Sequence, residues 1–158
     1  MDRISAILIQ AHSKPSFEKY EDTNVRDNTN CYSHALGLTL PYLDLYRIGA
    51  LSGKKPTEQE YFSIEEIEKL LIADCTELQL KITKSSLEEE LSENEYKIIL
   101  FVKIWSNGKI GDYHFWRFED GIWTEKWRGR RMSEIQNFER DKLDYFPWNF
   151  VGIYKISR

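Results

Sequence analysis

Residues 97–127, KIILFVKIWSNGKIGDYHFWRFEDGIWTEKW, decide the fold of this chain. The β-branched and aromatic run Lys97–Trp105 predicts one strand. Tyr113–Glu119 and Ile122–Trp127 predict two more, because Asp120-Gly121 between them is a two-residue hairpin signal. These consecutive strands are expected to form an antiparallel sheet.

The N-terminal half is instead expected to be helical. Apolar residues at helical spacing predict a helix over Asp2–Ala11, and the cap-forming run Asn28-Thr29-Asn30 predicts another that opens at Cys31. Ser63 and Glu66 form a capping box for a third helix, expected to end near Asp74. The smaller expected elements are a strand over 78–82, a short helix over 86–91, a short helical or irregular link over 132–138 and a last strand over 149–156. The sequence predicts an α+β fold in a single domain, residues 1–158.

Composition narrows the function classes. The chain has 158 residues, of which 22 are Lys or Arg and 26 are Asp or Glu, for a formal net charge of −4. An acidic chain without a Lys/Arg block argues against nucleic acid as a partner. Its apolar runs are far too short for a membrane span or a secretory signal. Two cysteines do not make a disulfide framework, so a cytoplasmic location is expected.

Cys31 is the candidate nucleophile. At the start of a helix, free N–H groups and the positive end of the dipole favour a thiolate and can also hold an oxyanion. His114, on a strand distant in sequence, is the candidate base. Asn28 and Asn30 are candidate oxyanion donors, although capping explains either one equally well. Cys75 has no candidate base near it in sequence and receives no role.

The hairpin predicts a third member of the site. A two-residue turn pairs Glu119 with Ile122, so that Glu125 lies on the same sheet face as His114, one diagonal step away. A three-residue loop would put Thr124 or Lys126 there instead. Asp112, Glu134 and Asp141 are substitutes for the acidic role.

Four strings of this sequence resemble small bacterial papain-like cysteine hydrolases of the NlpC/P60 and effector-amidase type. They are NCYSHALG at 30–37, RIGALSG at 47–53, DYHFWR at 112–117 and DGIWTEK at 120–126. The resemblance implies a papain-like fold, with Cys31 as nucleophile, His114 as base and Glu125 as the third polar residue. The sequence departs from the family pattern at His34, Ile48 and Glu125, where an aromatic residue, a proline and a histidine are usual.

The function expected from these residues is hydrolysis of an amide bond in a protein or peptide, by a protease, an amidase or a glutamine deamidase without a cofactor. Asp112 and Trp116, which flank His114, are assigned to substrate binding. A role as effector, toxin or phage-encoded factor, delivered without a signal peptide, follows by analogy alone.

Three alternatives stay open. His34, one helical turn from Cys31, is a rival base. Cys31, His34, His114 and Asp112 could begin a metal site, but no second close ligand pair completes it, so no metal is expected. The chain could also be a non-catalytic binding or inhibitor protein that uses its surface rich in Trp and Arg.

Overall fold

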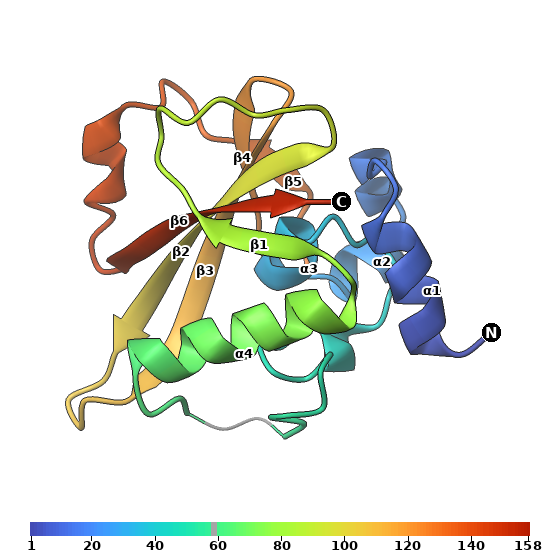
Figure 1. Ribbon diagram of the computed structural model, residues 1–158, viewed down its shortest axis with the longest axis horizontal. Coiled ribbons are helices and arrows are strands. Elements are labelled where there is room, and N and C mark those ends of the chain that lie inside the picture. Colours follow the sequence, from blue (N-terminus) through green and yellow to red (C-terminus); the bar gives the residue numbers. More distant parts are fainter. Residues whose placement is uncertain (58–59) are drawn as a thin grey trace.

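The computed structural model describes residues 1–57 and 60–158 and shows an α+β fold. The helices are α1 (Arg3–Ala11), α2 (Thr23–Asp27), α3 (Cys31–Ala35) and α4 (Ile64–Glu77), with short 3₁₀ turns at Phe17–Glu21, Leu43–Leu45 and Arg140–Leu143. The strands are β1 (Lys81–Lys84), β2 (Glu95–Ile104), β3 (Ile110–Glu119), β4 (Ile122–Lys126), β5 (Met132–Glu134) and β6 (Asn149–Ser157). Figure 1 shows α4 running across the sheet, with α1, α2 and α3 gathered beside it.

All six strands form one antiparallel sheet in the order β1-β6-β2-β3-β4-β5. The meander from β2 to β5 follows the predicted hairpins, whereas β6 returns from the C-terminus to lie between β1 and β2. Asp120 and Gly121 make the expected two-residue turn, with φ of 55° and 82°. Glu119 therefore pairs with Ile122 and Arg117 with Thr124, which confirms the predicted register.

The sheet has a different apolar cluster on each face. The cluster on the α3 and α4 face contains the aromatic rings of Tyr32 and Phe115, which stack with centroids 5.4 Å apart. The opposite face carries a smaller cluster around Phe101 and Trp116, covered by the segment that follows β5. Consecutive residues of β3 point to opposite faces, so each belongs to one cluster only.

Three predictions about local structure were wrong. Residues 86–91 do not form a helix: the Ser86 hydroxyl accepts from the Glu89 N–H as a cap would, but the carbonyl oxygens of Leu87 and Glu89 accept from the ammonium group of Lys97. The predicted strand over 78–82 begins later, at Lys81, since α4 continues to Glu77. The expected helical or irregular link over 132–138 contains β5, which extends the sheet through its pairing with β4.

Among the described residues, no helix combines the length and the apolar character that crossing a membrane requires.

Candidate functional site

Asn30 fixes the start of the helix that carries Cys31. Its Oδ1 accepts hydrogen bonds from the N–H groups of Tyr32 and Ser33, both at 3.0 Å, and the Ser33 hydroxyl accepts from the Asn30 N–H at 2.8 Å. The side-chain amide of Asn30 donates to the carbonyl of Tyr46 at 2.7 Å. The capping box fixes the first turn of α3, which carries Cys31. The bond to the Tyr46 carbonyl ties this turn to the loop that contains Tyr46.

The same bonds correct the oxyanion assignment. The N–H groups of Tyr32 and Ser33 are occupied by the cap, and the amide of Asn30 is directed to Tyr46. The amide of Asn28 donates to the carbonyl of Asn24 at 2.9 Å. Asn28 and Asn30 are therefore structural in this conformation. The Cys31 N–H, which has no hydrogen-bond acceptor in another described residue, is the donor left at this helix end.

The Cys31 sulfur lies at the edge of β3. Its Sγ is 3.8 Å from the carbonyl oxygen of Tyr113, and the N–H of Phe115 also stabilises the thiolate form. The hairpin register directs the N–H and C=O groups of Tyr113 and Phe115 toward β4. However, the pairing of β3 with β4 stops at Arg117, so these groups have no strand partner on that side. The thiol occupies the place where β3 and β4 separate.

Burial dominates the protonation of Cys31. The residue is 9% exposed, and burial raises the pKa of its thiol to about 12. The N–H groups of Phe115, Cys31 and Tyr32 oppose this rise, while the negative charge of Asp112 adds to it. In this conformation the sulfur is therefore a protonated thiol at neutral pH, contrary to the activated thiolate expected from its place at the helix start.

Glu125 holds the His114 imidazole as predicted. The imidazole Nε2 lies 3.1 Å from Oε1 of Glu125, and the His114 side chain is fully buried. The indole of Trp127 stacks flat on the imidazole, with ring centroids 3.7 Å apart and planes 6° apart, and Trp148 lies 5.7 Å away. The second ring nitrogen, Nδ1, is buried without a hydrogen-bond partner among the described residues.

Cys31 and His114 are neighbours that no described hydrogen bond joins. The sulfur contacts the backbone immediately before His114, through the Tyr113 carbonyl, and the Phe115 N–H that follows His114 acts to lower the pKa of the thiol. The imidazole leaves the strand between these two points, on the face that carries Phe101 and Trp116. The structure thus brings the two residues to the same part of β3 but shows no hydrogen bond between the Cys31 sulfur and Nδ1 of His114.

His34 is not a rival base. Its Nε2 lies 2.9 Å from the Thr124 hydroxyl and its Nδ1 lies 3.3 Å from the Tyr20 hydroxyl. Burial lowers the pKa of His34 well below its usual range, so this is a neutral core histidine. Among the described residues, no group of three or more His, Cys, Asp or Glu side chains is arranged to hold a metal ion.

The remaining assigned residues separate into two groups. Asp112 is exposed and lines the cavity at Cys31. Trp116 does not line this cavity: it is 2% exposed, packs on Phe101 and lies with Glu125 at a second cavity, so its assignment to substrate binding stays a prediction. Glu134 and Asp141 line a different cavity, on the outer side of Glu125, and make no described bond to His114.

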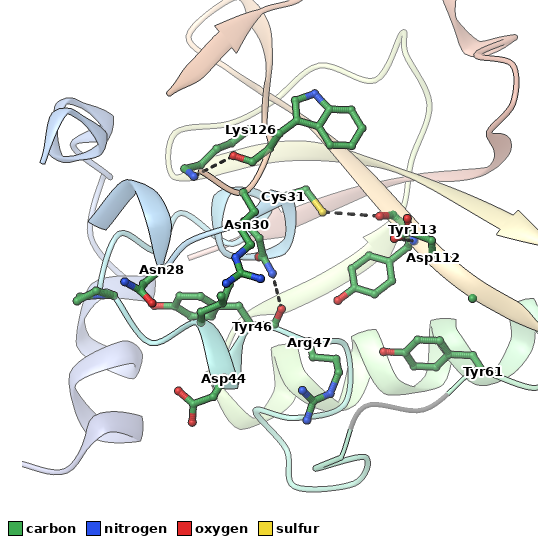
Figure 2. A pocket seen from close by; sticks show the side chains of 15 residues that line it. Asn28, Asn30, Cys31, Asp44, Tyr46, Arg47, Tyr61, Asp112, Tyr113 and Lys126 are labelled. Carbon is green, nitrogen blue, oxygen red and sulfur yellow. Dashed lines mark hydrogen bonds between the residues drawn. The ribbon is translucent and has the colours of Figure 1, made fainter. Parts of the chain in front are cut away.

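A cavity of about 720 Å³ opens beside the Cys31 thiol. Figure 2 shows Cys31, Asp112 and Arg47 on different sides of it. Its walls come from five parts of the chain: the α2–α3 connection, residues 41–47, Tyr61, the start of β3 and the end of β4. The lining residues are Asn28, Asn30, Cys31, Pro41, Leu43, Asp44, Tyr46, Arg47, Tyr61, Gly111, Asp112, Tyr113, Lys126, Trp127 and Arg128.

Sequence reasoning missed Arg47, Trp127 and Arg128 as parts of the site. The register that placed Glu125 also puts residue 127 opposite residue 114, so the stacking of Trp127 on His114 was available from the sequence. Arg47 belongs to one of the strings that carried the family resemblance, but no local pattern indicated that its loop reaches Cys31.

Comparison with protein-family models, with curated proteins and with solved structures found no match to this chain. The resemblance to papain-like cysteine hydrolases therefore stays a prediction.

Proposed function

We propose that this protein is a papain-like cysteine hydrolase that cleaves an amide bond in a protein or peptide. The observation that carries the proposal is the position of the Cys31 thiol, in a cavity and against the β3 backbone on both sides of His114. The Glu125 carboxylate and the Trp127 ring hold the imidazole, and Nδ1 is the nitrogen left without a partner. Because Glu125 fixes Nε2, Nδ1 is the nitrogen that can exchange a proton with the thiol.

In the proposed reaction Sγ of Cys31 and Nδ1 of His114, which no described hydrogen bond joins in this conformation, come within hydrogen-bond distance. His114 takes the thiol proton as Sγ attacks the substrate carbonyl, and the Cys31 N–H donates to the oxygen that becomes negative. The imidazolium then returns the proton to the leaving amine, so that the C–N bond breaks and a thioester remains on Cys31. Water then gives a proton to His114 and attacks the thioester, the C–S bond breaks to release the acid, and the imidazolium returns its proton to the Cys31 sulfur.

The high pKa of the resting thiol sets the order of these steps. A thiolate is unfavourable in the buried site, so the proton should leave during the attack and not before it. Glu125 stabilises the imidazolium that forms in that step, which gives its buried carboxylate a role beyond orientation. Service as an effector, toxin or phage-encoded factor remains a prediction by analogy.

A burst experiment with p-nitrophenyl acetate tests the proposal. The thiol should displace nitrophenolate and become acetylated, giving one equivalent of nitrophenolate in the burst and an acetyl group on the Cys31 peptide. Cys31→Ser should abolish the burst, and His114→Ala should slow both acylation and release by at least about 100-fold. Cys75→Ser is the matched control and should behave like wild type, since Cys75 is fully buried away from the cavity.

The rival function is a non-catalytic binding protein. The protonated thiol and the missing bond between Sγ and Nδ1 favour it. It predicts no burst and equal, slow acetylation in wild type and His114→Ala, and that result would overturn the hydrolase proposal.

A further inference from the structure

Some charged side chains around the Cys31 cavity have partners of opposite charge or hydrogen-bond acceptors within the protein, and others do not. Asp44 is neutralised by Arg3 through two hydrogen bonds of 2.8 and 2.9 Å. Lys126 turns its ammonium group away from the cavity, toward the carbonyl oxygens of Arg26, Thr29 and Trp127. Asp44 is thus an exposed carboxylate offset by Arg3, whereas the Lys126 charge is used inside the protein.

Arg47 and Arg128 remain as cations. The Arg47 side chain donates to the carbonyl of Pro56 through one terminal nitrogen, while its Nε is buried without a partner. The Arg128 side chain is exposed. Among residues 1–57 and 60–158, no carboxylate pairs with either guanidinium group, although the chain as a whole is acidic. Two guanidinium groups without a carboxylate partner therefore line this cavity, and guanidinium groups are suited to bind a carboxylate.

Asp112 lies on another side of the same cavity (Figure 2). Its Oδ1 accepts from the Tyr113 N–H at 2.8 Å, and no described cation pairs with it. A negative ligand group would be repelled from this side, so the electrostatic field of the cavity has a direction, from Asp112 beside Cys31 toward Arg47 and Arg128.

We propose that the cavity selects an acidic amide substrate whose carboxylate is held by Arg47 and Arg128 while its reacting carbonyl faces Cys31. That the bound molecule is a substrate rests on the proposed hydrolase function. The preference of the cavity for an anion does not, because it can be measured without turnover. Asp112 then faces the donor groups of the substrate, such as the N–H of the amide to be cleaved.

Two alkylating reagents of almost equal size test the preference. Iodoacetate carries a carboxylate and iodoacetamide does not; with both, an Sγ–C bond forms, the C–I bond breaks, iodide leaves and the thiol proton passes to the buffer. Alkylation of Cys31 is followed by mass spectrometry of its peptide. Each rate is divided by the rate of 2-mercaptoethanol with the same reagent, so that the intrinsic reactivity of the reagents cancels.

The normalised rate for iodoacetate should exceed that for iodoacetamide by about tenfold in wild type. Arg47→Gln and Arg128→Gln should each remove most of this preference, and Arg128→Glu should reverse it. Arg130→Gln is the matched control, because Arg130 is also exposed but does not line the cavity. Arg128 makes no described side-chain bond, so its variants keep the test valid even if Arg47→Gln unfolds.

No preference in wild type, or a preference that survives both arginine variants, would overturn the proposal. The two proposals fail separately. An iodoacetate preference without a nitrophenolate burst leaves an anion-binding cavity and removes the hydrolase, whereas a burst without the preference leaves the hydrolase and removes the acidic substrate.

Discussion

Replacing Glu125 tests how the imidazole of His114 is held. The carboxylate Oε1, 3.1 Å from Nε2, is the one described hydrogen-bond partner of a side chain that has 0% exposure. Glu125→Ala leaves both ring nitrogens buried without a partner. Glu125→Gln keeps an oxygen at nearly the same place and can still accept a bond from the Nε2–H of a neutral ring.

The expected loss of stability follows from the burial of the imidazole. A buried polar group that loses its partner destabilises the folded state by about 1–3 kcal/mol. We therefore expect Glu125→Ala to lower the free energy of unfolding by about 2 kcal/mol. For a chain of this length that corresponds to a fall in Tm of about 4–8 °C. Glu125→Gln should lose less than about 1 kcal/mol.

Urea unfolding followed by tryptophan fluorescence measures the difference, because Trp127 and Trp148 both lie against the imidazole. Glu134→Ala is the matched control: Glu134 is an exposed carboxylate near the outer side of Glu125 and has no described bond to His114. If Glu125→Ala and Glu134→Ala unfold at the same urea concentration, the carboxylate does not hold the ring and the account of the site fails.

Three further predictions follow from individual side chains. Asp112→Asn removes a charge that raises the pKa of the Cys31 thiol, so iodoacetamide should alkylate Cys31 a few-fold faster at pH 8; an unchanged rate contradicts this. Burial lowers the pKa of Lys126 to about 8, below its value in the unfolded chain. The free energy of unfolding of wild type relative to Lys126→Met should therefore grow from pH 8 to pH 10, measured by urea unfolding. A difference between the two proteins that does not change with pH would refute this. Asp74→Ala should lower the free energy of unfolding by about 3 kcal/mol, because the carboxylate accepts three hydrogen bonds from buried or part-buried donors; a loss below about 1 kcal/mol in urea would count against it.

The parts of the site that obey short-range rules could be predicted from the sequence. The turn at Asp120-Gly121 fixes the register of β3 and β4 by itself, and that register places Glu125 beside His114. The cap at Asn30 likewise fixes where the helix of Cys31 begins. In both cases the deciding residues lie within a few positions of each other, so no knowledge of the tertiary structure was needed.

The parts that depend on distant contacts could not be predicted. The amide of Asn30 donates to Tyr46, and the choice between this carbonyl and an oxyanion depends on where a separate loop passes. Trp116 was predicted to bind substrate, but residues of the segment after β5 pack on its ring. A sequence pattern gives the face of a strand on which a residue lies and not what covers that face.

The separation of β3 and β4 links the fold to the proposed chemistry. Had β4 stayed paired to the end of β3, residue 126 would have paired with residue 115, and the backbone groups that now meet the thiol would have been used within the sheet. Instead Lys126 binds the carbonyl oxygens of Arg26 and Thr29, which pulls the end of β4 toward the segment before Cys31. The opened edge admits the thiol beside His114, while the next residue, Trp127, closes over the imidazole. In the proposed hydrolase, Lys126 therefore acts on the site through the backbone, because its hydrogen bonds hold the end of β4 away from the part of β3 that carries His114.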